Sequence, residues 1–525
     1  MLLVRVVPSV RGGTQMPWDH LPNWRRPAWL LVALAVMYSL PVWATARMSR
    51  ELVIGQSTEV SHLDPHYSTS ACDLNVYANL YDTLVGRDEH LALEPALATS
   101  WTRIDDTTWQ FELREGVIFH NGAPLTSEDV EFSLERAAAD NPRTSAYAAL
   151  HLIERVEALN PYTVRIITQH PDPLLPARLA SPAGMILPKQ YFERVGMEGF
   201  RKAPIGSGPI KFVDWRKNEH LVFAANPRYW RTPIPYATVI YKPYPETAGR
   251  IAALLAGDVD FITDVPPDQV EAIEKTASAR VEIAPSARFI VLFLNVKKPP
   301  LDRKLVRQAM HYAIDRQAIV NKLWHGRGVV PNDAYPNVGM VGYDPSKPRF
   351  EYAPHKAREL LAKAGYTGEA ITIEAVVGAL APEPPLAEAI AAMFQQVGIN
   401  TVVRWLQPSD LVQTLQRKAI AGLLLSELAS PLLDPDDMFW RWLQPGGLYD
   451  YWRHPEWDRL MAQARQLHDQ EARAANYKQA ATIFLDAMPL LIVLQPENIV
   501  ALRKELRWQP RRDAIVKVDD IRPAR

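Results

Sequence analysis

A nearly continuous apolar run from Arg288 to Val296 (RFIVLFLNV) is the feature that most limits how this chain can fold. A strand with one face in water alternates apolar and polar residues, whereas a run without alternation predicts a strand buried on both faces. Such a strand requires packed layers on both sides of its sheet. A single hydrophobic core rarely supports a chain of 525 residues, so we expect more than one lobe. We expect this strand to cross between the lobes.

An amphipathic helix is predicted directly after this strand. Its apolar residues recur at helical spacing and form one stripe, which consists of Val306, Ala309, Met310, Ala313 and Ile314. Four basic residues fall elsewhere on the helical wheel, namely Arg303, Lys304, Arg307 and Arg316.

Strands and helices alternate through residues 297–490. Two helices each end at a glycine that can take a positive φ, His355 to Ala364 before Gly365 and Leu386 to Val397 before Gly398. Strands are predicted beside them at Ile371 to Val377 and at Ile399 to Trp405. This alternation predicts an α/β lobe.

The earlier part of the chain is predicted to hold short strands and one well-capped helix. Glu51 to Ser57 reads as a strand, and Leu63-Asp64-Pro65 as a turn. Thr107 to Leu113 alternates in the way of a half-buried strand. Thr126 and Asp129 form a capping-box pattern, which predicts that a helix begins there. A Pro/Gly segment at residues 204–209 (PIGSGP) precedes two further strands and looks like a crossing between lobes.

The N-terminus predicts export. Arg25 and Arg26 precede an apolar run from Ala28 to Met37, and Ala44-Thr45-Ala46 supplies the small residues that signal peptidase reads. We therefore expect a signal peptide over residues 1–46, with cleavage after Ala46.

The alternative is a membrane anchor, but a membrane span needs about 20 apolar residues, and Ser39 and Pro41 interrupt this run. Either Met1 or Met16 fits as the first residue of the signal peptide. Cys72 is the only cysteine, so neither an internal disulfide nor a lipid-modified cysteine after the cleavage point is expected. An exported protein without a lipid anchor is expected in the periplasm.

The charge balance and the absence of common enzyme motifs argue against several classes of protein. The 58 basic and 59 acidic residues leave a net charge of -1, which does not fit nucleic-acid binding. The sequence contains no GxSxG, HExxH, Walker-type or GxGxxG motif. No catalytic residue, cofactor or metal site is therefore predicted, and a secreted hydrolase on a similar lobed scaffold is kept as the alternative.

Two groups of residues are candidate ligand sites. His62 and His66 flank Asp64 but lie in a predicted loop, so two ordinary loop histidines are a better interpretation than a metal pair. Residues 426–457 combine aromatic and charged side chains, as solute sites do. Most of these aromatic residues are nevertheless expected in the core, with Asp434 and Asp436 capping the next helix.

Residues 97–136 (LATSWTRIDDTTWQFELREGVIFHNGAPLTSEDVEFSLER) closely resemble the signature stretch of the extracellular solute-binding proteins of the peptide/nickel family, family 5. Further similar stretches are Leu63-Asp64-Pro65, 203–209, 295–316, 357–366 and Asp434-Pro435-Asp436. The resemblance covers essentially the whole mature chain.

The resemblance implies a periplasmic binding protein type II-like α/β fold with two lobes and three domains. The first domain would be discontinuous, with residues 47–90, 204–296 and 491–525; the second would be inserted at 91–203, and the third would span 297–490. The implied function is that of the solute receptor of an ABC importer, a monomer that delivers a peptide or peptide-like solute to permease subunits in the inner membrane. An opine, an oligosaccharide or a nickel complex remains an alternative solute.

The resemblance also implies where the solute binds. Carried onto this chain, the family's contact positions are Tyr67, Arg288, Phe289, Glu427 and Asp434, with Trp440 as a stacking wall. Peptide-binding members typically place a tryptophan, and three residues later an aspartate that pairs with the peptide amine, just before the Asp-Pro element. Those positions are Leu428 and Pro431 here, so the usual amine anchor is missing, and Glu427 or Asp434 could replace it.

Overall fold

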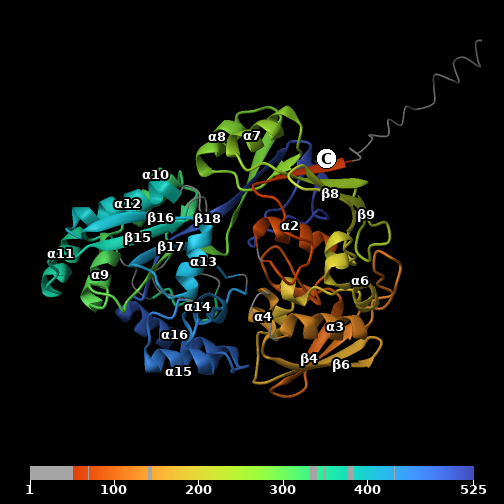
Figure 1. Ribbon diagram of the computed structural model, residues 1–525, viewed down its shortest axis with the longest axis horizontal. Helices are drawn as coiled ribbons and strands as arrows, with labels where there is room; N and C mark the ends of the chain where they lie inside the picture. Colours follow the sequence, from red (N-terminus) through yellow and green to blue (C-terminus); the bar gives the residue numbers. More distant parts are fainter. Residues whose placement is uncertain are drawn as a thin grey trace, which may run out of the picture. The chain divides into compact units, whose positions relative to one another are not determined.

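The computed structural model describes residues 51–524 apart from 69, 140–144, 332–339, 347–350, 377–382, 431 and 448 (Figure 1). The predicted signal peptide and its cleavage site lie outside the described residues, as does Pro431. Within the described part, no helix combines the length and the apolar character needed to cross a membrane.

One large mixed sheet organises the chain. Its strands follow the order β16-β15-β17-β13-β18-β11-β1-β10-β9-β8, with β12 and β14 also paired to β18. Their bounds are β1 Glu51–Gln56, β8 Ile210–Arg216, β9 His220–Ala225, β10 Thr238–Pro243, β11 Phe261–Ile262, β12 Ala279–Pro285, β13 Arg288–Leu294, β14 Gly328–Val329, β15 Ile371–Val376, β16 Thr401–Leu406, β17 Leu423–Ala429 and β18 Leu490–Arg503.

Strand β18 connects the two halves of this sheet. Its first residues pair with β13, whereas its later residues pair with β12 and β11. In Figure 1, β18 accordingly extends from the group of β15, β16 and β17 toward the part that carries α7 and α8. We call the part that contains β1 to β12 the first lobe and the part that contains β13 to β17 the second lobe.

The predicted strand at Arg288 to Val296 is confirmed as β13, and every residue after Arg288 in it is buried. Its alternate side chains enter two apolar clusters of the second lobe, Ile290, Leu292 and Leu294 in one and Phe289, Val291 and Phe293 in the other. The strand is therefore covered on both faces. Both clusters belong to the second lobe, so the expectation that this strand crosses between the lobes is wrong, and β18 is the crossing strand. The division into three domains, with a boundary at residue 297, stays a prediction.

A separate antiparallel sheet, β4-β5-β7-β6, lies in the first lobe. Its strands are β4 Ala98–Arg103, β5 Thr108–Leu113, β6 Ile153–Asn160 and β7 Thr163–Thr168. Helix α3 (Ser127–Ala138) packs on it and begins at the predicted capping box, in which Thr126 and Asp129 bind each other's backbone. The buried residues of this helix include Val130, Leu134 and Ala137, as its spacing requires.

The remaining elements are mostly helices and short strands. The helices are α2 Ala71–Leu80, α4 Ser145–Leu150, α5 Leu175–Arg178, α6 Lys189–Lys202, α7 Thr247–Ala256, α8 Val270–Glu274, α9 Lys304–Ala313, α10 Arg316–Leu323, α11 Pro354–Lys363, α12 Glu383–Gln396, α13 Pro408–Gln416, α14 Arg441–Leu443, α15 Pro455–Ala464 and α16 Gln470–Ala487. The short strands are β2 Val85–Arg87, β3 Leu93–Pro95, β19 Leu506–Arg507 and β20 Arg522–Pro523.

The α/β alternation of the second lobe is confirmed. Helices α11 and α12 are followed by Gly365 at φ 62° and Gly398 at φ 93°, and strands β15 and β16 pair in parallel beside them. The stripe of α9 is buried as expected. Arg307 and Arg316 lie outside that stripe but are also buried, because both guanidinium groups donate to main-chain carbonyls.

The Pro/Gly segment at 204–209 passes very close to the end of α2. A Cβ at Gly206 would lie 1.9 Å from the Leu80 carbonyl oxygen, and one at Gly208 would lie 2.3 Å from the Asn79 oxygen. No side chain fits at these separations, so the close approach explains both glycines. The segment joins α6 to β8 inside the first lobe, so the interpretation of it as a crossing between lobes is wrong.

The aromatic residues of 426–457 are mainly core residues, as expected. Trp440, Tyr449, Tyr451, Trp452 and Trp457 are all buried in one cluster of the second lobe. These rings stabilise the lobe by burying apolar area and by edge and stacked contacts with one another.

Candidate functional site

Arg288 and Glu427 form an ion pair at the junction between the lobes. Strands β13 and β17 pair antiparallel, with Ile290 opposite Glu427, so Glu427 lies on the same face as Arg288, two residues before Ile290. Arg288 Nη1 lies 3.5 Å from Glu427 Oε1, and the two side chains are 32% and 29% exposed. Both charged groups are thus accessible in part.

The crossing strand β18 supplies a third polar group to this pair. Arg288 Nη2 donates to Asn498 Oδ1 at 3.0 Å, and Asn498 Nδ2 donates to the carbonyl oxygens of Arg511 and Arg512. Because β18 belongs to the sheet of both lobes, this contact positions Arg288 relative to the first lobe.

The first lobe adds a carboxylate near Glu427. Asp264 follows β11, where the carboxyl ends of the parallel strands β1, β10 and β11 meet, which is where ligands of open α/β sheets bind. Its Oδ2 accepts from Ser57 and Thr263 at 2.9 Å. Burial raises the pKa of Glu427; the Arg288 charge opposes this shift, and the Asp264 charge adds to it. The site therefore concentrates negative charge beside one arginine.

Tyr67 lies in a different polar cluster, between two arginines. Its ring centroid is 5.5 Å from the guanidinium carbon of Arg136 on α3 and 4.7 Å from that of Arg201 on α6. Arg136 also pairs with Asp64 through two hydrogen bonds. All of these contacts lie within the first lobe, where they join the turn after β1 to two helices.

Phe289, Asp434 and Trp440 lie in the interior of the second lobe. Phe289 is 1% exposed and faces the apolar cluster that Trp440 also joins. Asp434 is 1% exposed; its Oδ2 pairs with Arg473 Nη2 at 2.8 Å, and its Oδ1 accepts from the Tyr477 hydroxyl at 2.8 Å. These placements favour structural roles for all three residues.

The position of the usual amine anchor can be traced in part. Leu428, where peptide binders carry a tryptophan, follows Glu427 in β17 and is buried, while Pro431 lies outside the described residues. Glu427 is therefore a carboxylate of the same strand, one residue before the replaced tryptophan.

Nδ1 of His62 and both ring nitrogens of His66 contact protein groups. His62 Nδ1 lies 3.0 Å from the Tyr77 hydroxyl, whereas His66 contacts Arg136 at 2.7 Å and the Met185 carbonyl oxygen at 3.2 Å. Burial lowers the pKa of His66 to about 4, and the nearby Arg136 charge acts in the same direction. This bonding gives both rings a structural role.

The contact of Arg178 with Asp436, which joins the lobes, was not predicted from the sequence. Arg178 lies on α5 of the first lobe, and its guanidinium donates to Asp436 of the second lobe. The two residues are separated by 258 positions, and no local pattern links them.

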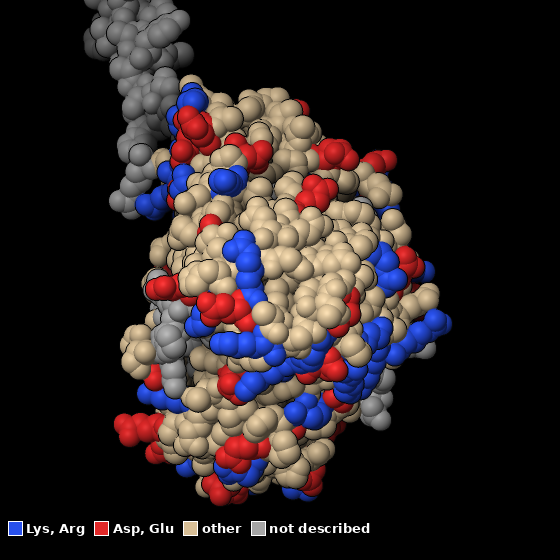
Figure 2. Space-filling view, turned by 90° about the vertical axis from the view of Figure 1, so that its left-hand side faces the viewer, with Lys and Arg blue, Asp and Glu red and all other residues tan. Residues whose placement is uncertain are grey.

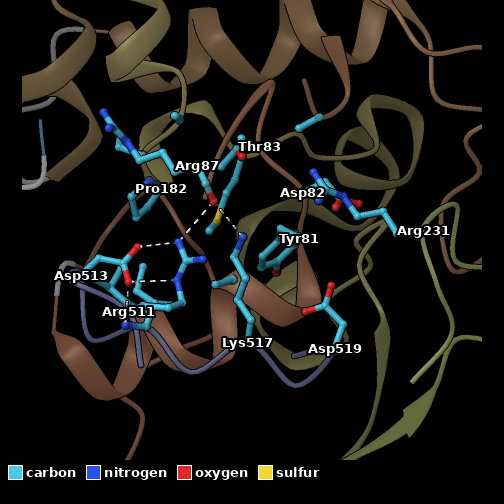
Figure 3. Close-up of a pocket in the computed structure, with 18 of the residues that line it drawn as sticks. Tyr81, Asp82, Thr83, Arg87, Pro182, Arg231, Arg511, Asp513, Lys517 and Asp519 are labelled. Carbon is cyan, nitrogen blue, oxygen red and sulfur yellow. Dashed lines mark hydrogen bonds and ion pairs between the residues drawn. The ribbon is translucent and has the colours of Figure 1, made fainter. Parts of the chain in front are cut away.

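A cavity of about 80 Å³ lies between α2 and the C-terminal segment 511–519 (Figure 3). Figure 3 shows Arg511 paired with Asp513, at 2.9 and 3.1 Å, and Lys517 pointing to the Arg87 carbonyl oxygen, at 3.5 Å. Asn79 of α2 accepts from the Val518 N–H at 2.8 Å. The Asn79 contact holds the C-terminal segment on α2, and the Lys517 contact connects it to β2.

Basic and acidic side chains are mixed on the face shown in Figure 2, where a blue band is interspersed with red. At the start of α9, Lys304 pairs with Asp486 at 2.9 Å and Arg303 pairs with Glu369. Such matching follows from the near-equal numbers of acidic and basic residues.

Known proteins resemble this chain in sequence and in fold. The sequence model of a protein family, described as bacterial extracellular solute-binding proteins, family 5 Middle, matches residues 92–450. The glutathione-binding protein GsiB of Pectobacterium atrosepticum is 29% identical over 343 residues, and the match spans 64% of this chain and 65% of that protein. The oligopeptide-binding protein AppA of Bacillus subtilis is 26% identical over 493 residues, which are 88% of this chain and 90% of that protein.

The solved structures agree with the fold described above. The periplasmic binding protein DppA of Helicobacter pylori, in complex with the peptide STSA, superposes with a TM-score of 0.79 at 25% identity. The alignment covers 90% of this chain and 98% of DppA. AppA of Bacillus subtilis in complex with a nonapeptide gives a TM-score of 0.78, also at 25% identity, over 90% and 99% of the two chains. Together with the family match over most of its length, these similarities show that the chain belongs to the bacterial extracellular solute-binding proteins of family 5.

Proposed function

We propose that this chain is the periplasmic receptor of an ABC importer, which captures a peptide-like solute between its lobes and delivers it to the membrane permease. The family match over residues 92–450 carries this proposal. Among its relatives, GsiB and AppA are named for binding glutathione and oligopeptides. The family and these relatives are solute-binding proteins, which argues against the hydrolase alternative.

We infer that the solute carries both an amine and a carboxylate. Arg288 and Glu427 have opposite charges on one face of adjoining strands, and their contact of 3.5 Å is longer than the roughly 2.7–2.9 Å of a strong charge-assisted hydrogen bond. A solute amine can pair with Glu427 while its carboxylate pairs with Arg288. The solute would then replace one weak ion pair by two closer ones.

This chemistry also ranks the alternative solutes. An opine carries an amine and carboxylates, as a peptide does, and is the second candidate. A neutral oligosaccharide would leave both charges without a new partner and would need aromatic rings to stack on. Trp440, Trp452 and Trp457 are buried in the core, which makes a sugar a poorer match.

Mass spectrometry of the solute released from denatured, freshly purified protein tests this proposal. We expect a small zwitterion that rebinds with 1:1 stoichiometry in calorimetry and is recovered unchanged after prolonged incubation. A neutral solute would contradict the inferred chemistry. Sustained turnover that a point mutation abolishes would contradict the receptor function itself.

The predicted export can be tested separately. N-terminal sequencing of the protein from the periplasmic fraction should begin at Arg47, within a residue or two, because Ala44-Thr45-Ala46 fits the peptidase site. A retained Trp29 would indicate a membrane-tethered form. Light scattering of the purified protein should give a monomer.

A further inference from the structure

Arg178 joins the two lobes through a buried network of ion pairs. Its Nε donates to Asp172 Oδ2 of the same lobe at 3.0 Å, and its Nη2 donates to Asp436 of the second lobe. Asp436 in turn pairs with Arg465 of its own lobe. The four side chains form a series of alternating charge that passes from one lobe to the other.

Three of the four side chains are buried, Arg465 is 20% exposed, and the charges of the network balance. The side chains of Arg178, Asp172 and Asp436 are 9%, 3% and 3% exposed. Buried charges are tolerated only when opposite charges and hydrogen bonds offset their lost hydration. Here two guanidinium groups face two carboxylates, so each buried charge has a partner.

Electrostatics keep both members of the crossing pair ionised. Burial acts against the charged form of Arg178, but Asp172 and Asp436 raise its pKa above the ordinary value. Burial likewise acts against the charged form of Asp436, but Arg178 and Arg465 hold its pKa below the ordinary value. Each charge therefore depends on a partner across the boundary between the lobes.

The outer part of the same boundary carries a second contact. His468, between α15 and α16 of the second lobe, has Nε2 3.1 Å from the Asp106 carbonyl oxygen in the turn between β4 and β5. Its ring lies 6.0 Å from that of Trp109 in the first lobe. Both of these contacts join the lobes through groups that belong to the protein itself.

We propose that Arg178 is a positioning residue that holds the two lobes closed on each other in the solute-free protein. The proposal rests on the proposed receptor function only in its consequence for affinity. A receptor that is already partly closed binds more tightly, because the apparent dissociation constant equals the intrinsic one divided by the closed fraction.

Loss of Arg178 should open the lobes. Without the guanidinium, closing buries Asp172 and Asp436 against each other with one positive charge fewer, whereas in the open state both carboxylates are hydrated. A charge-assisted hydrogen bond is worth a factor of about ten to a hundred in an equilibrium constant, and we expect the closing equilibrium to fall by this factor.

Small-angle X-ray scattering of the solute-free protein tests this proposal without a known ligand. The full chain is unfolded, dialysed to remove bound solute and refolded, and its radius of gyration is compared with those of Arg178→Met and Asp436→Asn. The matched control is Arg155→Met, which removes an exposed ion pair with Glu157 inside the first lobe. Circular dichroism establishes that each variant is folded.

We expect a larger radius of gyration for Arg178→Met and Asp436→Asn than for the wild type and Arg155→Met. Arg178→Lys, which keeps the charge but loses the forked donor geometry, should lie between them. Equal radii for all folded variants would overturn the proposal. If Arg178→Met does not fold, Asp436→Asn decides the outcome, and neither result depends on the identity of the solute.

Discussion

Arg288 on β13 faces Glu427 on β17 across one strand pairing, with Nη1 and Oε1 3.5 Å apart and Asn498 of β18 bound to the same guanidinium. The pair thus combines partial exposure with a fixed place at the strand that connects the lobes. This combination distinguishes it from the buried ion pairs of the second lobe, such as Asp434 with Arg473.

Substitution of either member of the pair should weaken solute binding and leave the fold intact. Arg288→Ala and Glu427→Gln each remove one charge-assisted contact, worth about 1.5–3 kcal/mol, or roughly ten- to a hundredfold in the dissociation constant. Calorimetry with the recovered solute measures this. Arg280→Ala and Glu282→Gln on β12 are matched controls, because that pair is similarly exposed, at 33% and 27%.

Equal affinities of the wild type, Arg288→Ala and Glu427→Gln would remove both residues from the site. If the solute amine binds Glu427, the affinity should also depend on pH. Burial raises the pKa of this carboxyl, so binding should weaken in mild acid as Glu427 takes up a proton. Glu427→Gln should not show that loss.

Asp434 should affect stability and not solute affinity. Arg473→Met leaves its carboxylate buried beside Tyr477 without an ion-pair partner, which should cost about 3–5 kcal/mol in the free energy of unfolding. Urea unfolding measures this cost, and calorimetry on the folded fraction should return the wild-type dissociation constant. An affinity loss at full stability would instead place Asp434 in the solute site.

Local spacing was sufficient to predict many elements of this fold. The capping box at Thr126 and Asp129, the glycines after α11 and α12 and the unbroken apolar run of β13 each depend on residues close together in sequence. The burial of Arg307 was not predictable in this way. Two of its carbonyl partners, Ala487 and Met488, belong to a helix end about 180 residues away.

The candidate site was predictable only in part, for the same reason. The family resemblance proposed six contact residues, and the structure brings Arg288 and Glu427 into contact, while Phe289 is core and Asp434 is paired internally. The bridge between Arg178 and Asp436 has no signal in the sequence, because its two ends come from different lobes. The tertiary structure determines which charged residues of the two lobes come into contact.

The close approach of the PIGSGP segment to α2 makes a further prediction. Gly206→Ala places a methyl group 1.9 Å from the Leu80 carbonyl oxygen, so the backbone must move, at a cost of about 1–3 kcal/mol or more in the free energy of unfolding. Gly249→Ala in α7 is the control, since the nearest atom to its Cβ lies at 3.9 Å. It should stabilise by about 0.4–1 kcal/mol. Similar unfolding midpoints for the two variants would contradict this account.

His120 should make the stability of the chain depend on pH. Its Nδ1 accepts from the Gly206 N–H at 3.1 Å, and its Nε2 lies 3.0 Å from the Gly208 carbonyl oxygen, so the ring is bound in its neutral form. Burial lowers its pKa from 6.5 to about 4. Below pH 6.5 the unfolded chain therefore takes up a proton that the folded chain does not, and stability is lost as the pH falls from 6.5 toward 4.

Between about pH 7.5 and about pH 5, His120 should thus lower the free energy of unfolding by about 2 kcal/mol, and His66, whose pKa is lowered likewise, should add a similar amount. Urea unfolding of His120→Gln at the two pH values should show a fall smaller by about 2 kcal/mol than that of the wild type, because glutamine does not titrate. The control is His90→Gln, whose side chain is 76% exposed and which should keep the wild-type dependence. If His120→Gln and His90→Gln lose stability equally on acidification, the neutral ring of His120 is not the source of the effect.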